Sequence, residues 1–183
     1  MTGNWFIALP VAAGEWFHAL TAPPGVRLFG AEDLHLTVAF LGPVDEAHAH
    51  AAFALAAGFP LQARRVQLGS VEALGNRRRP SAFSALLTEG RVQVEQALGA
   101  ARDAMWEAAG ARPDARPPLA HLTFARPSRR ASDHERAQAL TWAKQLDLGA
   151  PQCQLTRIAL YTWSHDRATA LFRIVRELPL PAA

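Results

Sequence analysis

Cysteine, lysine and long apolar runs are all scarce in this chain. Its 183 residues include one cysteine, Cys153, so no disulfide can form within it and nothing calls for an oxidising compartment. No run approaches the ~18 apolar residues that a membrane-spanning helix needs, and no basic stretch precedes the first apolar residues. The sequence therefore predicts a cytoplasmic protein without a signal peptide or a membrane span.

Lysine occurs once, at Lys144, and the other basic residues are 18 arginines. Alanine reaches 38 residues, so the arginine excess reflects a compositional drift, and a net charge of +3 is too small to indicate extended nucleic-acid binding. A ligase that works through a lysyl adenylate is nearly excluded, because Lys144 lies in a helical pattern without the expected glycine.

Strand-like and helix-like patterns alternate along the chain without internal repeats. Short turns join many neighbouring strands, which favours antiparallel pairing, and the length and 50% hydrophobic content fit one domain or two closely packed lobes. We expect a mixed α+β fold. Helices are predicted at 12–20, 45–57, 92–109 and 132–146, and strands at 5–9, 34–41, 61–74, 81–88, 119–126, 155–162 and 170–178.

The most informative feature is a tripeptide that occurs twice, as His35-Leu36-Thr37 and His121-Leu122-Thr123. The composition predicts about 0.04 such triplets, so two copies are far above chance. Both copies lie in strand patterns. Alternation places His35, Thr37 and Ala39 on one face and Leu36, Val38 and Phe40 on the other, and it treats the second copy in the same way.

Two such strands facing each other would line a cleft with two imidazoles and two hydroxyls. That set suits the hydrolysis of a phosphodiester without a metal ion. A neutral imidazole takes a proton from water, and an imidazolium gives one to the leaving oxygen. The hydroxyls would donate to the non-bridging phosphate oxygens as charge develops on them.

The two motifs resemble the His-x-Thr-x pair of the 2H phosphoesterase superfamily. The match is closest to the RNA 2′,3′-cyclic phosphodiesterases, historically called 2′-5′ RNA ligases (LigT-like). The run 33–42, Asp-Leu-His-Leu-Thr-Val-Ala-Phe-Leu-Gly, is very similar to that family's first motif, and Arg126 completes a His-x-Thr-x-x-Arg form in the second. The 86-residue separation of the motifs and the N-terminal strand agree as well, so the resemblance covers nearly the whole chain.

The resemblance implies one domain over residues 1–183, built from two pseudo-symmetric lobes with antiparallel sheets around a central cleft and helices outside. It implies metal-free opening of a terminal RNA 2′,3′-cyclic phosphate to a 2′-phosphate, with no cofactor. His35 would be the proton donor and His121 the proton acceptor, and Thr37, Thr123 and Arg126 would bind the phosphate. The expected partners are RNA ends or small cyclic nucleotides, and the expected state is a monomer.

Three positions qualify this resemblance. Strict alternation points Arg126 away from His121, so its role requires a twist of the strand before Pro127. Asn4 stands where the family often carries arginine, and Phe172 stands where a tyrosine is common, although Tyr161 and Ser164 keep part of that region. The changes at Asn4 and Phe172 concern the grip on the substrate more than the proton chemistry.

Other interpretations stay open. The chain could be a non-catalytic module that binds RNA ends or nucleotides, or a 2H esterase acting on small cyclic nucleotides or 2′-5′ oligoadenylates. Ligation, if it occurs, would be ATP-independent and would draw on the energy of the cyclic phosphate. A metal site at the two histidines lacks a third ligand, and Cys153 lacks the local partners of a nucleophile. The run Arg77-Arg78-Arg79 is either an RNA contact or a solvated hairpin tip.

Overall fold

The computed structural model describes residues 3–76, 79–167 and 169–183. Within these residues nine strands pair antiparallel into one sheet. The strands are β1 Trp5–Pro10, β2 Val26–Leu28, β3 His35–Gly42, β4 Arg64–Gly75, β5 Pro80–Leu87, β6 His121–Pro127, β7 Gln152–Leu155, β8 Arg157–Trp163 and β9 Phe172–Pro179. Their order is β7-β4-β5-β6-β3-β1-β8-β9, and β2 pairs with β6 outside that path.

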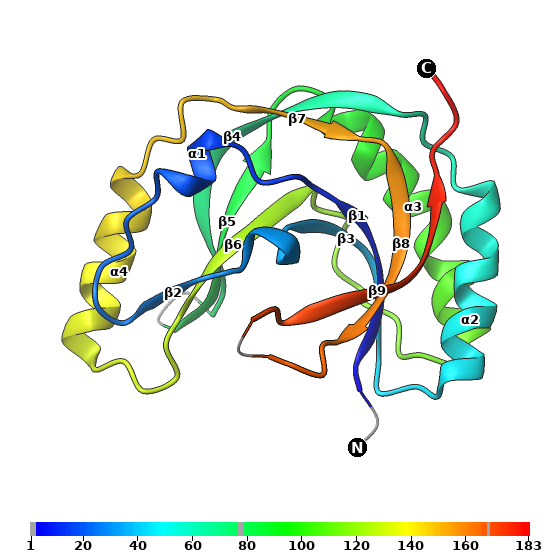
Figure 1. Cartoon of the computed structure of the whole chain (residues 1–183), viewed down its shortest axis with the longest axis horizontal. Coiled ribbons are helices and arrows are strands. Elements are labelled where there is room, and N and C mark those ends of the chain that lie inside the picture. Colours follow the sequence, from blue (N-terminus) through cyan, green and yellow to red (C-terminus); the bar gives the residue numbers. More distant parts are fainter. Residues whose placement is uncertain (1–2, 77–78, 168) are drawn as a thin grey trace.

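The sheet curls into a half-barrel (Figure 1). β7 lies at one end of the sheet order and β8 near the other, yet only Thr156 separates them in the chain. A single residue cannot span a flat sheet, so the two ends must approach each other, as the right-handed twist of strands allows. One face of the sheet is thereby concave, and the two motifs lie on its central strands, β3 and β6.

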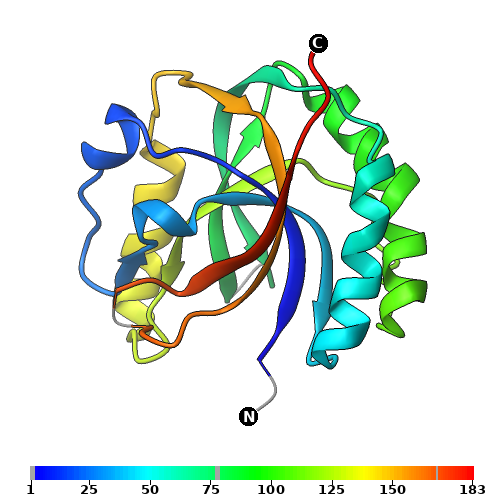
Figure 2. The ribbon, with the colours of Figure 1, turned by 45° about the vertical axis from the view of Figure 1, so that its right-hand side comes forward.

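In the described residues four α-helices cover the outside: α1 Glu15–His18, α2 Glu46–Ala54, α3 Arg91–Ala109 and α4 Asp133–Gln145. Figure 2 shows α2 and α3 together on one side and α4 on the other. Local capping sets their ends. Asp45 accepts the backbone N–H of His48 at the start of α2, and Ser132 and Glu135 form a capping box at the start of α4. No helix in the described residues is long and apolar enough to span a bilayer.

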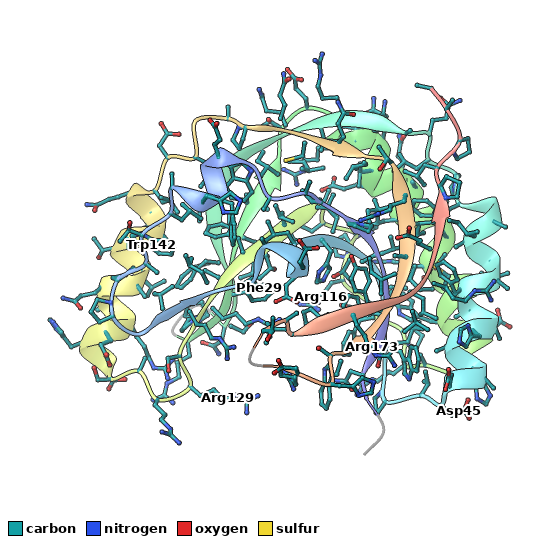
Figure 3. All side chains as sticks on the ribbon, in the orientation of Figure 1. Phe29, Asp45, Arg116, Arg129, Trp142 and Arg173 are labelled. Carbon is teal, nitrogen blue, oxygen red and sulfur yellow. The ribbon has the colours of Figure 1, made fainter. Side chains whose placement is uncertain are left out.

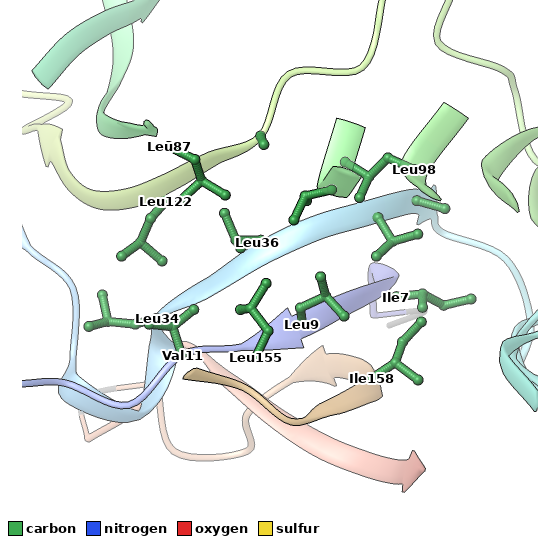
Figure 4. Close-up of a cluster of buried hydrophobic side chains, with 14 of the residues drawn as sticks. Ile7, Leu9, Val11, Leu34, Leu36, Leu87, Leu98, Leu122, Leu155 and Ile158 are labelled. Atoms are coloured by element: carbon green, nitrogen blue, oxygen red, sulfur yellow. The ribbon is translucent and has the colours of Figure 1, made fainter. Parts of the chain in front are cut away.

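The main core lies behind the two motifs (Figure 4). Leu36 of β3 and Leu122 of β6 are 1% and 0% exposed, and they join the same apolar cluster as Ile7 and Leu9 of β1. The motif residues between the histidine and the threonine therefore anchor both strands. Burial of one leucine side chain is worth about 2 kcal/mol, so each anchor contributes substantially to holding its motif in place.

The predicted α+β class and antiparallel pairing are confirmed, with local differences. The predicted helix at 12–20 contracts to the single turn of α1, and the predicted strand at 61–74 begins at Arg64. The strands β2 and β7 were not predicted, because three and four residues are too few to show a period. The two expected sheets join into one through the pairing of Leu36 with Leu122.

Candidate active site

The two tripeptides meet at the centre of the concave face. β3 and β6 are antiparallel neighbours and their Cα register pairs Leu36 with Leu122. In that register, His35 lies toward Thr123 and Thr37 lies toward His121. Directly opposed side chains on one face of a sheet are about 5 Å apart and diagonal ones about 7 Å. Two imidazoles and two hydroxyls therefore share one patch, whose size suits a phosphate group.

Each motif strand carries a β-bulge immediately after its threonine. In β3 the register passes from Ala8–Thr37 to Ile7–Ala39, so Val38 has no residue opposite it. In β6 it passes from Ser84–Thr123 to Phe83–Ala125, which leaves Phe124 as the extra residue. A bulge inserts one residue and so reverses the faces of all residues beyond it.

The bulges correct the prediction for the residues that follow each threonine. Ala39 and Ala125 are buried in the core behind the sheet instead of lying on the motif face. Phe40 and Arg126, five residues after each histidine, lie on the concave face, and Phe40 is 54% exposed. Arg126 thus reaches the site by a bulge, where strict alternation had pointed it away.

Both histidines are oriented by backbone carbonyls. Nδ1 of His35 lies 2.7 Å from the oxygen of Asp33, and Nδ1 of His121 lies 2.7 Å from the oxygen of Leu119. A carbonyl only accepts, so each Nδ1 carries the proton and donates it. Nε2 of each ring then carries a lone pair when the ring is neutral and a proton when the ring is charged. The same ring atom can act as base or as acid.

Aromatic rings enclose His35 on the concave face. Phe6 and Tyr161 lie 4.8 and 5.4 Å from its ring centroid, and Phe172 meets it edge-on at 5.6 Å. Phe172, the residue that stands where a tyrosine was expected, therefore contributes an apolar edge next to the imidazole. These contacts come from β1, β8 and β9, which lie far from His35 in the sequence.

Asp33 links this enclosure to the motif. Its carboxylate is buried, with 1% of the residue exposed, and it accepts backbone N–H groups from Gly30, Leu171 and Phe172. The carbonyl of the same residue accepts the Nδ1 proton of His35. Asp33 thus holds the start of β9, and with it Phe172, against the ring that its own backbone orients.

Burial lowers the pKa of both histidines. For His35 the pKa falls from its usual 6.5 to about 4, mainly because the charged ring is desolvated. The nearby charges of Arg126 and His121 lower it further, against the opposing effect of Asp33. The pKa of His121 is also lowered, by burial first and by the charge of Arg116 as well. Both rings are therefore neutral at pH 7 in the free protein.

The two threonines differ in their partners. Oγ1 of Thr123 lies 2.8 Å from the hydroxyl of Ser84, which is 0% exposed and sits opposite it on β5. The residue opposite Thr37 is Ala8, which offers no such partner. Ser84 therefore restricts the rotation of one hydroxyl of the pair. No local signal in the sequence could have identified Ser84, because it reaches Thr123 only across the sheet.

Two arginines lie beside the central patch. Arg126 stacks over the ring of Phe29 at 5.0 Å, and its charge acts on His35. Arg116 pairs with Asp114 in the loop before β6, and its charge lowers the pKa of His121. Figure 3 shows Phe29 and Arg116 between β6 and β9. Beyond the far end of β3, a hollow of about 700 Å³ is lined by residues of 40–44 and 110–115.

The other candidates in the sequence do not join this site. Arg77 and Arg78 lie outside the described residues, and Arg79 is exposed beyond the end of β4. The thiol of Cys153 is buried and its pKa is raised, which disfavours the thiolate that a nucleophile needs. Within residues 3–76, 79–167 and 169–183, no group of three or more His, Cys, Asp or Glu side chains could hold a metal ion.

Comparison with known proteins places the fold. No family model matches the sequence, and no curated protein does. Solved structures match over the whole length. A phosphoesterase is 21% identical with a TM-score of 0.69, covering 99% of both chains. LigT of E. coli complexed with 3′-AMP is 19% identical with a TM-score of 0.68, covering 97% of this chain and 98% of that one.

The protein TT0787 of Thermus thermophilus is 18% identical with a TM-score of 0.70, and 98% of each chain is covered. Because nearly all of each chain is covered, the likeness extends over the whole curled sheet and its helices. The predicted resemblance to the LigT-like 2H phosphoesterases is confirmed at the level of the fold. This chain has the α+β fold of that family.

Proposed function

We propose that this protein opens the 2′,3′-cyclic phosphate of RNA ends, or of small cyclic nucleotides, to a 2′-phosphate. The observation that carries the proposal is the geometry of the two imidazoles. Each donates Nδ1–H to a backbone carbonyl, and both lie on one face in antiparallel register with two threonines. Such a pair can hold one proton and one lone pair at the same phosphate.

The reaction proceeds by in-line displacement at phosphorus. Nε2 of His121 accepts a proton from water as the water oxygen forms its bond to phosphorus. In the reactive form, in which the pair holds one proton, Nε2 of His35 carries that proton and donates it to O3′ as the P–O3′ bond breaks. The product carries a 2′-phosphate and a free 3′-hydroxyl, and the pair ends with its proton moved from His35 to His121. This division of roles follows the family resemblance, with His35 as the donor.

Thr37, Thr123 and Arg126 bind the phosphate in this proposal. The hydroxyls donate to the non-bridging oxygens, and the guanidinium offsets the charge that grows on them. A hydrogen bond donated by Ser84 would turn the Thr123 hydroxyl hydrogen toward the phosphate, which the 2.8 Å contact between the two hydroxyls supports. LigT, which shares the fold, has been crystallised with 3′-AMP and with phosphate, which supports a nucleotide phosphate as the ligand.

The first test is incubation of the protein with a nucleoside 2′,3′-cyclic phosphate in excess EDTA, with separation of the 2′- and 3′-phosphate products. Turnover should persist in EDTA, because the proposed step uses no metal ion. The 2′-phosphate should be the only product, because His35 donates its proton to O3′ and so makes it the leaving group. A cyclic-phosphate-ended oligonucleotide is the second substrate. Binding of both substrates without turnover would show that the protein is a binding module and not an enzyme. Release of the 3′-phosphate would show that O2′, and not O3′, is the leaving group.

The same site would join RNA ends when a 5′-hydroxyl replaces water as the nucleophile. The bond formed is then a 2′-5′ phosphodiester, and the energy comes from the strained cyclic phosphate. Incubation of a cyclic-phosphate-ended RNA with a 5′-hydroxyl RNA in the absence of ATP tests this step. A requirement for ATP would contradict it.

The pH dependence of kcat/KM should be shifted to the acid side. The free enzyme's histidines set this profile, and both have pKa values below 6.5, that of His35 about 4. Below the lower pKa both rings are charged and no base remains. Above the higher one both are neutral and no acid remains. The maximum is therefore expected between about pH 4 and 6.5, with a roughly tenfold fall per pH unit above it.

Initial rates at low substrate concentration and constant ionic strength, from about pH 3 to 9, measure this profile on both sides of the expected maximum. The cyclic phosphodiester stays a monoanion across that range, so the limbs belong to the enzyme. A flat rate that extends to about pH 8 would mean that the histidines are not the limiting pair in the free protein.

A further inference from the structure

Arg126 is surrounded by other arginines at one end of the concave face. Arg27 of β2 is its direct cross-strand partner and lies on the same face. The pKa of Arg126 is lowered mainly by burial, and then by the charges of Arg129, in the turn after β6, and Arg167, in the turn between β8 and β9. We call Arg27, Arg126, Arg129 and Arg167 the arginine group. Its members come from β2, from β6, from the turn after β6 and from the turn between β8 and β9.

This arrangement costs stability when the face is empty. Like charges directly opposite each other in an antiparallel pair are destabilising. In the described part of the chain, none of the four guanidinium groups forms an ion pair with a carboxylate. Arg116, by contrast, is paired with Asp114. Anions from outside the chain would relieve the repulsion.

Aromatic rings accompany the charges. Arg126 lies over the ring of Phe29 at 5.0 Å, and Arg167 lies over the ring of Trp163 at 4.8 Å. The rings restrict the guanidinium groups while leaving their N–H edges available to phosphate oxygens. Phe40, at the position in β3 that corresponds to Arg126 in β6, is uncharged. The two ends of the motif patch are therefore chemically different.

We infer that the arginine group binds the phosphodiester backbone of an RNA strand whose cyclic end lies at the two histidines. The inference rests on the proposed function and makes a short oligonucleotide, not a mononucleotide, the preferred substrate. Arg126 links the histidine pair to the arginine group. Its charge is close enough to His35 to lower the pKa of that ring, and Arg27 lies opposite Arg126 on β2. The next phosphates of the strand would then occupy Arg27, Arg129 and Arg167.

The test compares two substrates with two matched double variants. One variant is Arg27→Gln with Arg129→Gln. The control is Arg65→Gln with Arg173→Gln, which removes the same charge from exposed residues of β4 and β9. The substrates are uridine 2′,3′-cyclic phosphate and a tetranucleotide with a 2′,3′-cyclic end. The ratio of kcat/KM for the tetranucleotide to that for the mononucleotide should fall about tenfold in the first variant and stay constant in the control.

Fluorescence anisotropy with a tetranucleotide that ends in a 2′-phosphate provides a readout without catalysis. Each phosphate contact with a single strand contributes about 0.7 to the slope of log Kd against log salt, so the first variant should lose about 1.4. An unchanged ratio and slope, or equal losses in the control, would overturn the RNA path. If the wild type opened no cyclic phosphate, the proposed function would fail while the anisotropy still tested the arginine group.

Single substitution of Arg167 by glutamine extends the test to the other arm of the sheet. The slope of log Kd against log salt should become shallower. Arg167 belongs to the turn between β8 and β9, and its charge is close enough to Arg126 to lower the pKa of that guanidinium. Equal competition by polyglutamate would point to an acidic protein instead of RNA and would also overturn the inference. Thermal unfolding of each variant shows that the comparison is made on folded protein.

Discussion

Replacement of either His35 or His121 by alanine should lower kcat for 2′,3′-cyclic phosphate opening by about 10³-fold. Each imidazole transfers one proton in the proposed step, and a positioned acid or base contributes about 10²- to 10⁴-fold. The two losses should not add. Without its base, the site gains little from its acid, so the double variant should be only slightly slower than either single one.

Binding separates an enzyme from a binding module in this experiment. The hydroxyls and Arg126 remain in both variants, so the Kd for a 2′-phosphate-ended nucleotide should change far less than kcat. The matched control is His134→Ala, an exposed histidine on α4 away from the motif strands. Full activity in both motif variants would show that the chemistry lies elsewhere on the molecule.

Asp33→Asn should destabilise the fold by about 3 kcal/mol and also move the pH profile. The buried carboxylate accepts three backbone N–H groups, and an asparagine directs its own N–H₂ toward some of them. Loss of the negative charge removes an effect that raises the pKa of His35. The acid limb of kcat/KM should therefore shift to still lower pH, and kcat/KM at pH 7 should fall about tenfold.

Urea unfolding measures the first effect, and the pH series described above measures the second. Glu32→Gln is the control, because Glu32 precedes Asp33 in the same turn and is exposed. It should leave both quantities close to the wild type. A stability loss in Asp33→Asn with an unchanged pH profile would reduce Asp33 to a structural role and would remove it as a positioning residue for His35.

Local order along the chain made much of this molecule predictable. The two tripeptides stood out because their residues are adjacent, and alternation correctly separated His35 and Thr37 from Leu36 and Val38. The helix starts at Asp45 and Ser132 were also readable, since a capping side chain bonds to backbone only three residues away. In each case the interaction falls within a few residues of its signal.

Two bulges escaped prediction, and they changed the site. A bulge is a property of a strand pair, because the extra residue exists only relative to the partner. Val38 and its neighbour Ala39 both enter the core, which turns Phe40 outward onto the concave face. Arg126 reaches the same face in the same way. A single-strand pattern contains no information about which residue the neighbouring strand skips.

By itself, the sequence determined the antiparallel α+β class, the two histidine-threonine pairs and the apolar residues that anchor them, because each depends on contacts between near neighbours in the chain. Only the tertiary structure decided the environment of those pairs. Ser84 beside Thr123, the rings around His35 and the charges around Arg126 all come from residues distant in sequence. Burial and charge at a site sum over everything that packs there, and the packing of separate strands has no local signature.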